Sequence, residues 1–169
     1  MYLKAITNYT KETIKLSDSN PLKRLVKKDL VIIDSNAKNS TELFNTFSKI
    51  AIEKGYVNRK FLPKIIERES NFPTGLALDN YSVAIPHTDA DTIEDEFVGV
   101  IVSKNGTKFK RMDDPGKEID AKVEFILGLK QPHAQLEMLQ YLMSLIQDEG
   151  KIQKLINSNS VNEVIKLLR

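Results

Sequence analysis

Short apolar runs alternate along this chain with segments of helical periodicity, and this alternation limits the fold more than any other feature. The runs 29–34, 97–103 and 122–129 are rich in β-branched residues and end at polar or turn residues, which is typical of buried strands. Even these runs are far shorter than the roughly 20 apolar residues that cross a bilayer. Between the second and third runs lie two turn signals, Asn105-Gly106 and Asp114-Pro115-Gly116, which predict a hairpin or a wide connection between strands. The pattern predicts an α/β fold without a membrane span.

Helix boundaries are marked by capping residues. Asn39 followed by Glu42 is a capping-box pattern, and Gly55 closes the helix that it opens. Pro132 suits the first position of a long late helix. The predicted helices cover 40–54, a segment from Asn58 to about Ser70, a long segment from Pro132, 151–156, and a last segment after Ser160.

Strands interleaved with helices predict a single domain with a mixed central sheet flanked by helices on both faces. A chain of 169 residues suits one domain, since roughly 150 residues per domain is usual. Residues 1–28 have a mixed pattern interrupted at 17–21, so we interpret them as an N-terminal arm and 29–169 as the domain. The N-terminus lacks the features of a secretory signal, and we expect a cytoplasmic protein.

The composition narrows the chemistry that the chain can perform. With no cysteine it forms no disulfide, and with two histidines we expect no metal site. A net charge of +2 gives no reason to expect a nucleic-acid partner. Dinucleotide-binding, Walker A, nucleophile-elbow and HExxH signatures are all missing. The search for a reactive group therefore narrows to the histidines.

His87 follows Ile85 and Pro86 in a loop, 71–89, that is punctuated by proline, glycine and asparagine. Proline fixes the backbone just before the histidine, so we expect a stiffly held and accessible imidazole. Because imidazole titrates near neutral pH, it can attack phosphorus and later act as a leaving group. A second interpretation remains open at this point, in which His87 is a half-exposed polar residue without a functional role.

For two further residues, His133 and Arg68, both a functional and a structural role are open. His133 lies at the predicted start of the late helix, where helix N–H groups favour an anion, but such a histidine often only bonds to nearby backbone. Arg68 lies near the end of a helix that leads to the loop. Its guanidinium is able to hold a phosphate, or to complement the helix dipole.

Several carboxylates flank His87 in the sequence. They are Asp79, Asp89, Asp91, Glu94, Asp95 and Glu96. Such a group is compatible with acid–base chemistry or a metal, but we expect a solvated acidic loop.

Four short motifs together resemble the enzyme IIA domains of the mannitol and fructose class of the phosphoenolpyruvate-dependent sugar phosphotransferase system. They occur in the family's order, and the resemblance covers roughly residues 29–169. The motifs are Arg68-Glu69, Pro73-Thr74-Gly75-Leu76, Val83-Ala84-Ile85-Pro86-His87 and Pro132-His133. The resemblance implies a type 2 enzyme IIA domain and a phosphotransferase activity.

The resemblance also implies residue roles and partners. His87 would accept a phosphoryl group from the carrier HPr and pass it to a cysteine of a IIB component, reaching the membrane component IIC only indirectly. His133 would lie beside His87 and stabilise its phosphorylated form, and Arg68 would orient the phosphate. Phosphoryl transfer needs positioning and charge stabilisation more than covalent machinery, so these residues would need no cofactor.

Three features resemble the galactitol-type branch: Thr88-Asp89-Ala90 after the active histidine, a longer loop between Leu76 and Val83, and the segment from Lys130 to Glu137. A sugar specificity of this kind is an inference from similarity, because a IIA protein contacts other proteins rather than the sugar. Two alternatives remain open. One is a regulatory, nitrogen-type protein whose phosphorylation state controls protein partners, and the other is a binding domain with structural histidines.

Overall fold

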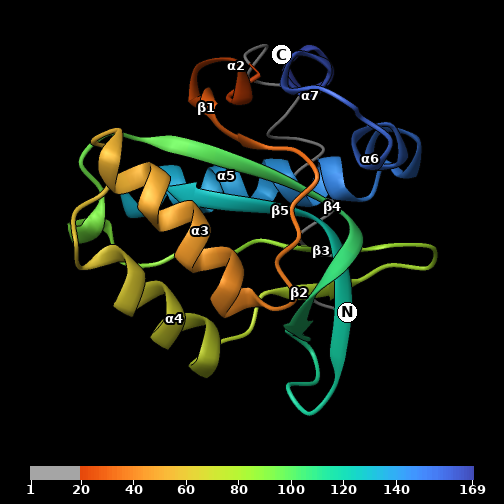
Figure 1. Cartoon of the computed structure of the whole chain (residues 1–169), viewed down its shortest axis with the longest axis horizontal. Coiled ribbons are helices and arrows are strands. Elements are labelled where there is room, and N and C mark those ends of the chain that lie inside the picture. The colour runs from red at the N-terminus through yellow and green to blue at the C-terminus, as the bar shows by residue number, and fades with distance from the viewer. Residues whose placement is uncertain (1–19) are drawn as a thin grey trace.

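A computed structural model describes residues 20–169, and within them five strands form one mixed sheet in the order β1-β4-β5-β3-β2 (Figure 1). The strands are β1 Val26–Ile32, β2 Gly75–Ala77, β3 Ser82–Ala84, β4 Phe97–Lys110 and β5 Glu118–Gly128. The β1/β4 and β3/β5 pairs are parallel, whereas β4/β5 and β2/β3 are antiparallel. This arrangement confirms the predicted mixed sheet.

The two central strands form the long hairpin whose turn was predicted at Asp114-Pro115-Gly116. The Lys117 N–H donates to the Asp114 carbonyl at 2.9 Å and closes that turn. The second predicted turn, at Asn105-Gly106, is wrong: Gly106 lies inside β4 with φ +82°, where the pairing with β5 shifts register between Val102 and Thr107. Glycine serves a bulge here because it tolerates positive φ.

Two helices cover one face of the sheet. The helix α3, Ser40–Glu53, begins where the Asn39 side chain accepts from the Glu42 N–H at 2.9 Å, as the capping pattern predicts. The helix α4, Phe61–Asn71, follows after a short connection. Large aromatic side chains fill the space between these helices and the sheet, among them Phe44, Phe47 and Phe97. This layer fixes α4, which carries Arg68.

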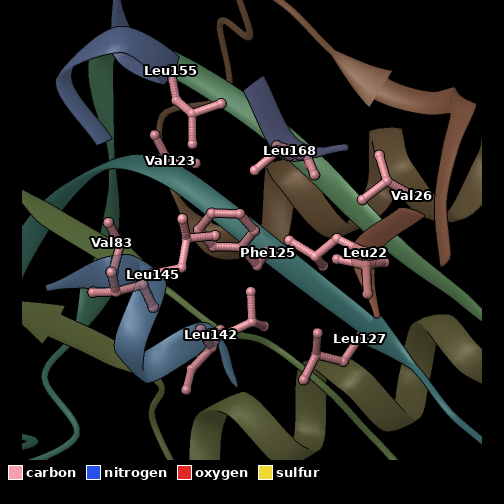
Figure 2. Packing of buried hydrophobic residues seen from close by; sticks show 14 of the residues in the cluster. Leu22, Val26, Val83, Val123, Phe125, Leu127, Leu142, Leu145, Leu155 and Leu168 are labelled. Atoms are coloured by element: carbon pink, nitrogen blue, oxygen red, sulfur yellow. The ribbon is translucent and has the colours of Figure 1, made fainter. Parts of the chain in front are cut away.

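Three helices cover the opposite face: α5 Pro132–Ile146, α6 Glu149–Ile156 and α7 Val161–Leu168. Alternate β5 residues, Val123, Phe125 and Leu127, pack against Leu142 and the other apolar side chains of this layer (Figure 2). The two hydrophobic layers confirm the prediction of a sheet flanked by helices on both faces. Within residues 20–169, no helix is long and apolar enough to cross a membrane.

The start of the described chain belongs to the core. A short helix, α2 Leu22–Leu25, leads into β1, and Leu22, Leu25 and Val26 are buried among side chains of the α5, α6 and α7 layer. The predicted arm 1–28 therefore has its last residues inside the domain, while 1–19 lie outside the described residues. Sequence patterning missed this because the run 22–26 contains two basic residues.

Candidate functional site

His87 lies where the chain leaves β3 and passes the carboxyl-terminal end of β5. The Leu127 N–H donates to the Pro86 carbonyl at 3.0 Å, and His87 itself forms an isolated parallel bridge with Leu127. The segment is thus attached to a central strand on one side and restricted by Pro86 on the other. This confirms the prediction of a stiffly held histidine, which is half-buried.

The imidazole of His87 has one nitrogen engaged. Its Nδ1 lies 2.8 Å from the carbonyl oxygen of Ile85. A carbonyl can only accept, so Nδ1 carries the proton and Nε2 keeps its lone pair in the neutral ring. Burial lowers the pKa of His87, and the charge of Arg68 lowers it further, against the opposing effect of the Ile85 contact. The ring is therefore neutral, with a free Nε2, at neutral pH.

A pocket of about 390 Å³ opens beside His87. It lies between the loop after β3, the C-terminal half of α4 and the first turns of α5. Its lining residues are Arg68, His87, Thr88, Asp89, Ala90, Pro132, Gln135, Leu136 and Leu139. The pocket brings together two of the three residues singled out from the sequence, His87 and Arg68.

Arg68 presents an unused donor to this region. Its Nε is buried and has no hydrogen-bond partner among residues 20–169, and its guanidinium carbon lies 5.1 Å from the centre of the Phe72 ring. A buried N–H with no acceptor is costly unless a ligand supplies one. Stacking on Phe72 keeps the planar group oriented, so Arg68 is suited to hold an anion in the pocket.

The neighbouring Glu69 performs a structural task. Both of its oxygens accept from the Thr74 hydroxyl, and Oε1 also accepts from the Thr74 N–H at 2.8 Å. Burial raises the pKa of Glu69 to about 7, although the bonds from Thr74 oppose this. Glu69 therefore attaches the end of α4 to the turn before β2 and stabilises the position of Arg68.

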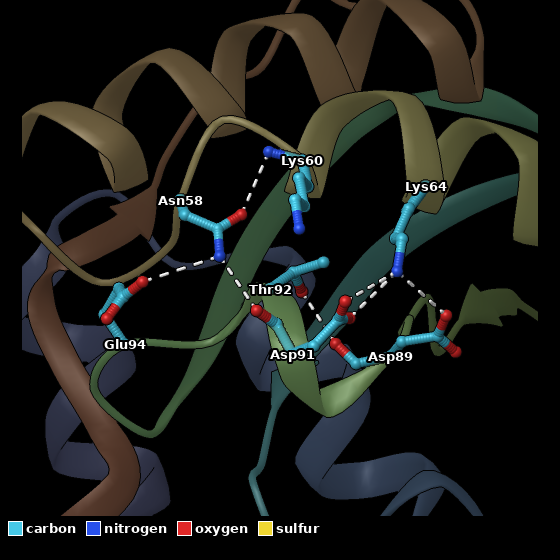
Figure 3. Close-up of polar contacts among 7 residues, drawn as sticks. All are labelled: Asn58, Lys60, Lys64, Asp89, Asp91, Thr92 and Glu94. Carbon is cyan, nitrogen blue, oxygen red and sulfur yellow. Dashed lines mark hydrogen bonds and ion pairs between the residues drawn. The ribbon is translucent and has the colours of Figure 1, made fainter.

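Lys64 holds the loop that follows His87. From α4 it binds Asp91 at 2.8 Å and Asp89 at 3.4 Å (Figure 3). Asn58 also donates to the Asp91 carbonyl at 2.8 Å. The sequence favoured a freely solvated acidic loop here, whereas the structure pairs its first two carboxylates with a lysine. One consequence is that the negative charge of Asp89, which lines the pocket, is partly offset by a cation that it shares with Asp91.

The structure does not bring His133 into the pocket. The side chain is 84% exposed, and Nε2 lies 3.0 Å from Glu137 Oε1. His133 lies in the first turn of α5, as predicted, but Gln135 from the same turn lines the pocket. Residues two positions apart in a helix point about 200° apart, so the two side chains face opposite directions. The supporting role of His133 stays a prediction that this position does not favour.

Sequence reasoning missed Gln135, Thr88 and Lys64. A signal for Gln135 existed, because counting back by three and by seven from Met138 and Leu142 leads to Gln135 and places it on the packed side of α5. Thr88, which is buried, was noted in the sequence only as part of the Thr88-Asp89-Ala90 resemblance, and no local pattern pointed to the pairing of Lys64 across the fold. Within residues 20–169, no three His, Asp or Glu side chains are grouped so that they could hold a metal ion.

Comparison with known proteins gives a family and a fold. The sequence model of the family described as "Phosphoenolpyruvate-dependent sugar phosphotransferase system, EIIA 2" matches residues 24–169. The galactitol-specific EIIA component of Escherichia coli K12 is 27% identical over 118 residues, which is 69% of this chain and 77% of that protein. The mannitol-specific enzyme IIA component of Halalkalibacterium halodurans is 25% identical over 141 residues, or 83% and 91% of the two chains.

Solved structures share the fold. The crystal structure of IIA mannitol from Escherichia coli has a TM-score of 0.70 at 20% identity, covering 85% of this chain and 99% of that one. The IIA chain in a complex of enzyme IIA mannitol with phosphorylated enzyme IIB mannitol, also from Escherichia coli, has a TM-score of 0.69 at 21% identity, with 86% and 96% covered.

Proposed function

Since this chain belongs to the phosphoenolpyruvate-dependent sugar phosphotransferase system EIIA 2 family, we propose that His87 is the residue that carries the phosphoryl group between HPr and a IIB component. The observation that supports this most directly is the contact between Nδ1 and the Ile85 carbonyl, at 2.8 Å. It leaves Nε2 as the free nucleophile of a residue that lines a pocket.

The transfer needs no group outside the two proteins. The Nε2 lone pair of His87 attacks phosphorus on phospho-HPr, the new N–P bond forms, and the donor's N–P bond breaks with its electron pair returning to the donor imidazole. The phosphorylated His87 ring becomes a cation whose Nδ1–H still donates to the Ile85 carbonyl. When an acceptor thiolate of IIB attacks this phosphorus, the N–P bond breaks with its electron pair returning to the ring, and neutral imidazole is a good leaving group.

Arg68 is proposed to orient the phosphoryl oxygens. Its unpartnered Nε and its position in the pocket with His87 support this role. A fixed cation close to the reacting phosphorus stabilises charge on the equatorial oxygens without reorganisation during the reaction. For His133 the corresponding role stays a prediction, which would require the first turn of α5 to reorient.

Protein partners are proposed to dock over the mouth of the pocket. Leu136 lines the pocket and is 54% exposed, and Phe72 beside Arg68 is 64% exposed. Exposed apolar side chains next to a reactive group are typical of a protein contact surface. HPr and IIB would use overlapping parts of it in turn, and IIC would be reached only through IIB. Phosphoenolpyruvate is a cytoplasmic metabolite, so we propose that the exchange occurs in the cytoplasm.

The finer proposal is a galactitol-type system. It is supported by the similarity to galactitol-specific EIIA components and by Thr88 and Asp89, which border His87. Both residues help to shape which IIB surface can approach in line with the N–P bond. The specificity in question is therefore for a protein partner.

The test of the proposed function is labelling with radioactive phosphoenolpyruvate, enzyme I and HPr. The wild-type protein should take up acid-labile label, His133→Ala should still be labelled, and His87→Ala should not. Label on His87→Ala would contradict the proposal. Labelling of His87 with no onward transfer to any IIB protein would instead support the regulatory function.

A further inference from the structure

We infer that the side-chain amide of Gln135 donates a hydrogen bond to the phosphoryl group on His87, in the place that the family resemblance gave to a second histidine. The inference rests on the proposed function of His87 and adds a residue to it. Three observations support it: the side of α5 that faces the pocket, the lack of a hydrogen-bond partner for the Gln135 side chain within residues 20–169, and the charges of the residues that line the pocket.

The direction is set by the packing of α5. Gln135, Leu136 and Leu139 line the pocket, and positions i, i+1 and i+4 project from one side of a helix. The buried residues Met138 and Leu142 hold this orientation against the sheet. The helix therefore cannot present His133 to the pocket without withdrawing its apolar side chains from the core.

The amide of Gln135 is free to bind. Within residues 20–169 its side chain makes no hydrogen bond, and its backbone N–H is already used by the Gln131 carbonyl at 3.0 Å. His133, in contrast, is engaged with Glu137 at 3.0 Å on the exposed side of the helix. The side chain of Gln135 is half-buried, so its two donors and one acceptor meet the pocket rather than bulk solvent.

The charges in the pocket favour a neutral donor. Arg68 is the cation that lines it, and Asp89 is the anion, whose charge Lys64 offsets in part from outside the pocket. A phosphoryl dianion adds three acceptor oxygens, more than one guanidinium edge fills. An amide donates at every pH and adds no charge, so it stabilises the phosphorylated state without trapping the group against transfer to IIB.

The test compares Gln135→Glu with Gln140→Glu. Both substitutions add the same charge to the same helix and keep the side-chain size, but Gln140 does not line the pocket. The equilibrium distribution of label between HPr and His87 is measured for each, together with the ³¹P resonance of the phosphorylated protein. Gln135→Glu should shift the distribution toward HPr by at least about tenfold, since a hydrogen bond to a charged group is lost and a repulsion is added. Gln140→Glu should match the wild type.

Two further variants keep the inference falsifiable. Gln135→Ala removes the donor without adding charge and should shift the distribution in the same direction by a smaller factor, with a moved ³¹P resonance. Gln135→His should restore the donor to the phosphoryl group that Gln135→Ala lacks. It should also make the distribution of label pH-dependent between about pH 5.5 and 7.5, where imidazole titrates. The inference would be overturned by an unchanged distribution and resonance in Gln135→Ala and Gln135→Glu, or by a loss in His133→Ala instead. In either case, labelling of the wild type would still support the proposed function of His87. An unlabelled wild type would overturn both.

Discussion

The Nδ1 atom of His87 lies 2.8 Å from the carbonyl oxygen of Ile85, two residues earlier in the chain. Pro86 between them fixes the backbone, and its own carbonyl accepts from the Leu127 N–H of β5. The tautomer of the histidine is therefore set by backbone that is itself attached to the central sheet. This single contact decides which ring nitrogen is available for chemistry, and the first prediction follows from it.

We expect phosphoryl acceptance to persist below the usual pKa of histidine. The pKa of His87 is lowered by burial and by Arg68, so the reactive neutral ring remains at a pH where an ordinary histidine is protonated. The acceptance rate should stay level from pH 8 to about 6.5 and fall only at lower pH. NMR titration of the imidazole resonances, assigned with His133→Gln, measures this directly. A His87 midpoint above 6.5 would contradict it.

Arg68 should matter for its geometry as well as its charge. Losing a positioned donor at a transition state costs about a hundredfold in rate, and we expect this loss for Arg68→Ala. Arg68→Lys keeps the charge but not the planar group that stacks on Phe72, so it should recover only part of the rate. The measurement is single-turnover transfer from phospho-HPr.

The matched control for Arg68 is Arg111→Lys. Arg111 binds Asp113 at the far end of β4 and does not line the pocket. Its substitution should leave the transfer rate unchanged. If Arg68→Lys were as fast as the wild type, a point charge would suffice and the role of the planar guanidinium would be excluded.

Lys64 should affect the rate through the charge of Asp89. Lys64→Met leaves Asp89 and Asp91 unbalanced beside the incoming phosphoryl group, so acceptance should slow severalfold, and more at low salt. Adding Asp89→Asn should restore part of the rate, which a double-mutant cycle would measure. Lys60→Met is the control, because among the described residues the ion pairs of Asp89 and Asp91 are made by Lys64 and not by Lys60 (Figure 3). Equal slowing in Lys60→Met would show that overall charge, rather than the Lys64 contact, is responsible.

Glu124 should make the stability of the domain depend on pH. It is fully buried in β5 and accepts from Ser103 at 3.0 Å through Oε2, and among residues 20–169 its Oε1 has no hydrogen-bond partner. Burial raises its pKa to about 8 from the usual 4.5, against the opposing bond from Ser103. Between these values the folded state holds a proton that the unfolded state lacks. The free energy of unfolding should therefore fall as pH rises from about 5 to 8.

Glu124→Gln should remove this contribution. Relative to the wild type, the free energy of unfolding of the variant should therefore be higher at pH 9 than it is at pH 5. Denaturant unfolding at pH 5, 7 and 9 measures it, with Glu118→Gln as the control from the exposed end of the same strand. Glu69, whose pKa is raised to about 7, adds a similar dependence that both variants keep. An identical pH slope in the wild type and Glu124→Gln would mean that Glu124 is ionised in the folded state.

Local signals predicted most of the architecture, because they act within one element. The capping residues Asn39 and Ser160 marked helix starts that the structure confirms. The strand β2 was missed, since Gly75–Ala77 is short and is stabilised by pairing with β3 rather than by its own composition. Asn105-Gly106 was misread because the same dipeptide serves a turn or a bulge, and only the partner strand decides which.

The site was harder to predict, because it is assembled from contacts between elements. His87 was singled out through its local motif, and Arg68 through its place near the end of a helix and through the resemblance. The phosphoryl-carrying and phosphate-orienting roles of the two residues stay predictions. The position of His133 was carried over from a motif without the helical phase of α5, which its buried side chains set. The ion pairs of Lys64 with Asp89 and Asp91 join residues that are 25 and 27 positions apart, so no local sequence pattern indicates them.

The last prediction concerns which IIB protein receives the phosphoryl group. Transfer requires the acceptor sulfur to approach in line with the N–P bond at His87, so the residues around the pocket mouth decide which IIB surface fits. Thr88 is buried in the pocket wall and Asp89 is held by Lys64, so this rim is rigid and its shape is specific. Transfer from phosphorylated His87 to purified galactitol-type, mannitol-type and fructose-type IIB proteins should be fastest with the galactitol type. Replacing Thr88-Asp89 by Gly-Thr should narrow that preference while the labelling of His87 continues. Faster transfer to the mannitol or fructose IIB would exclude the galactitol assignment and leave the phosphoryl-carrying role of His87 intact.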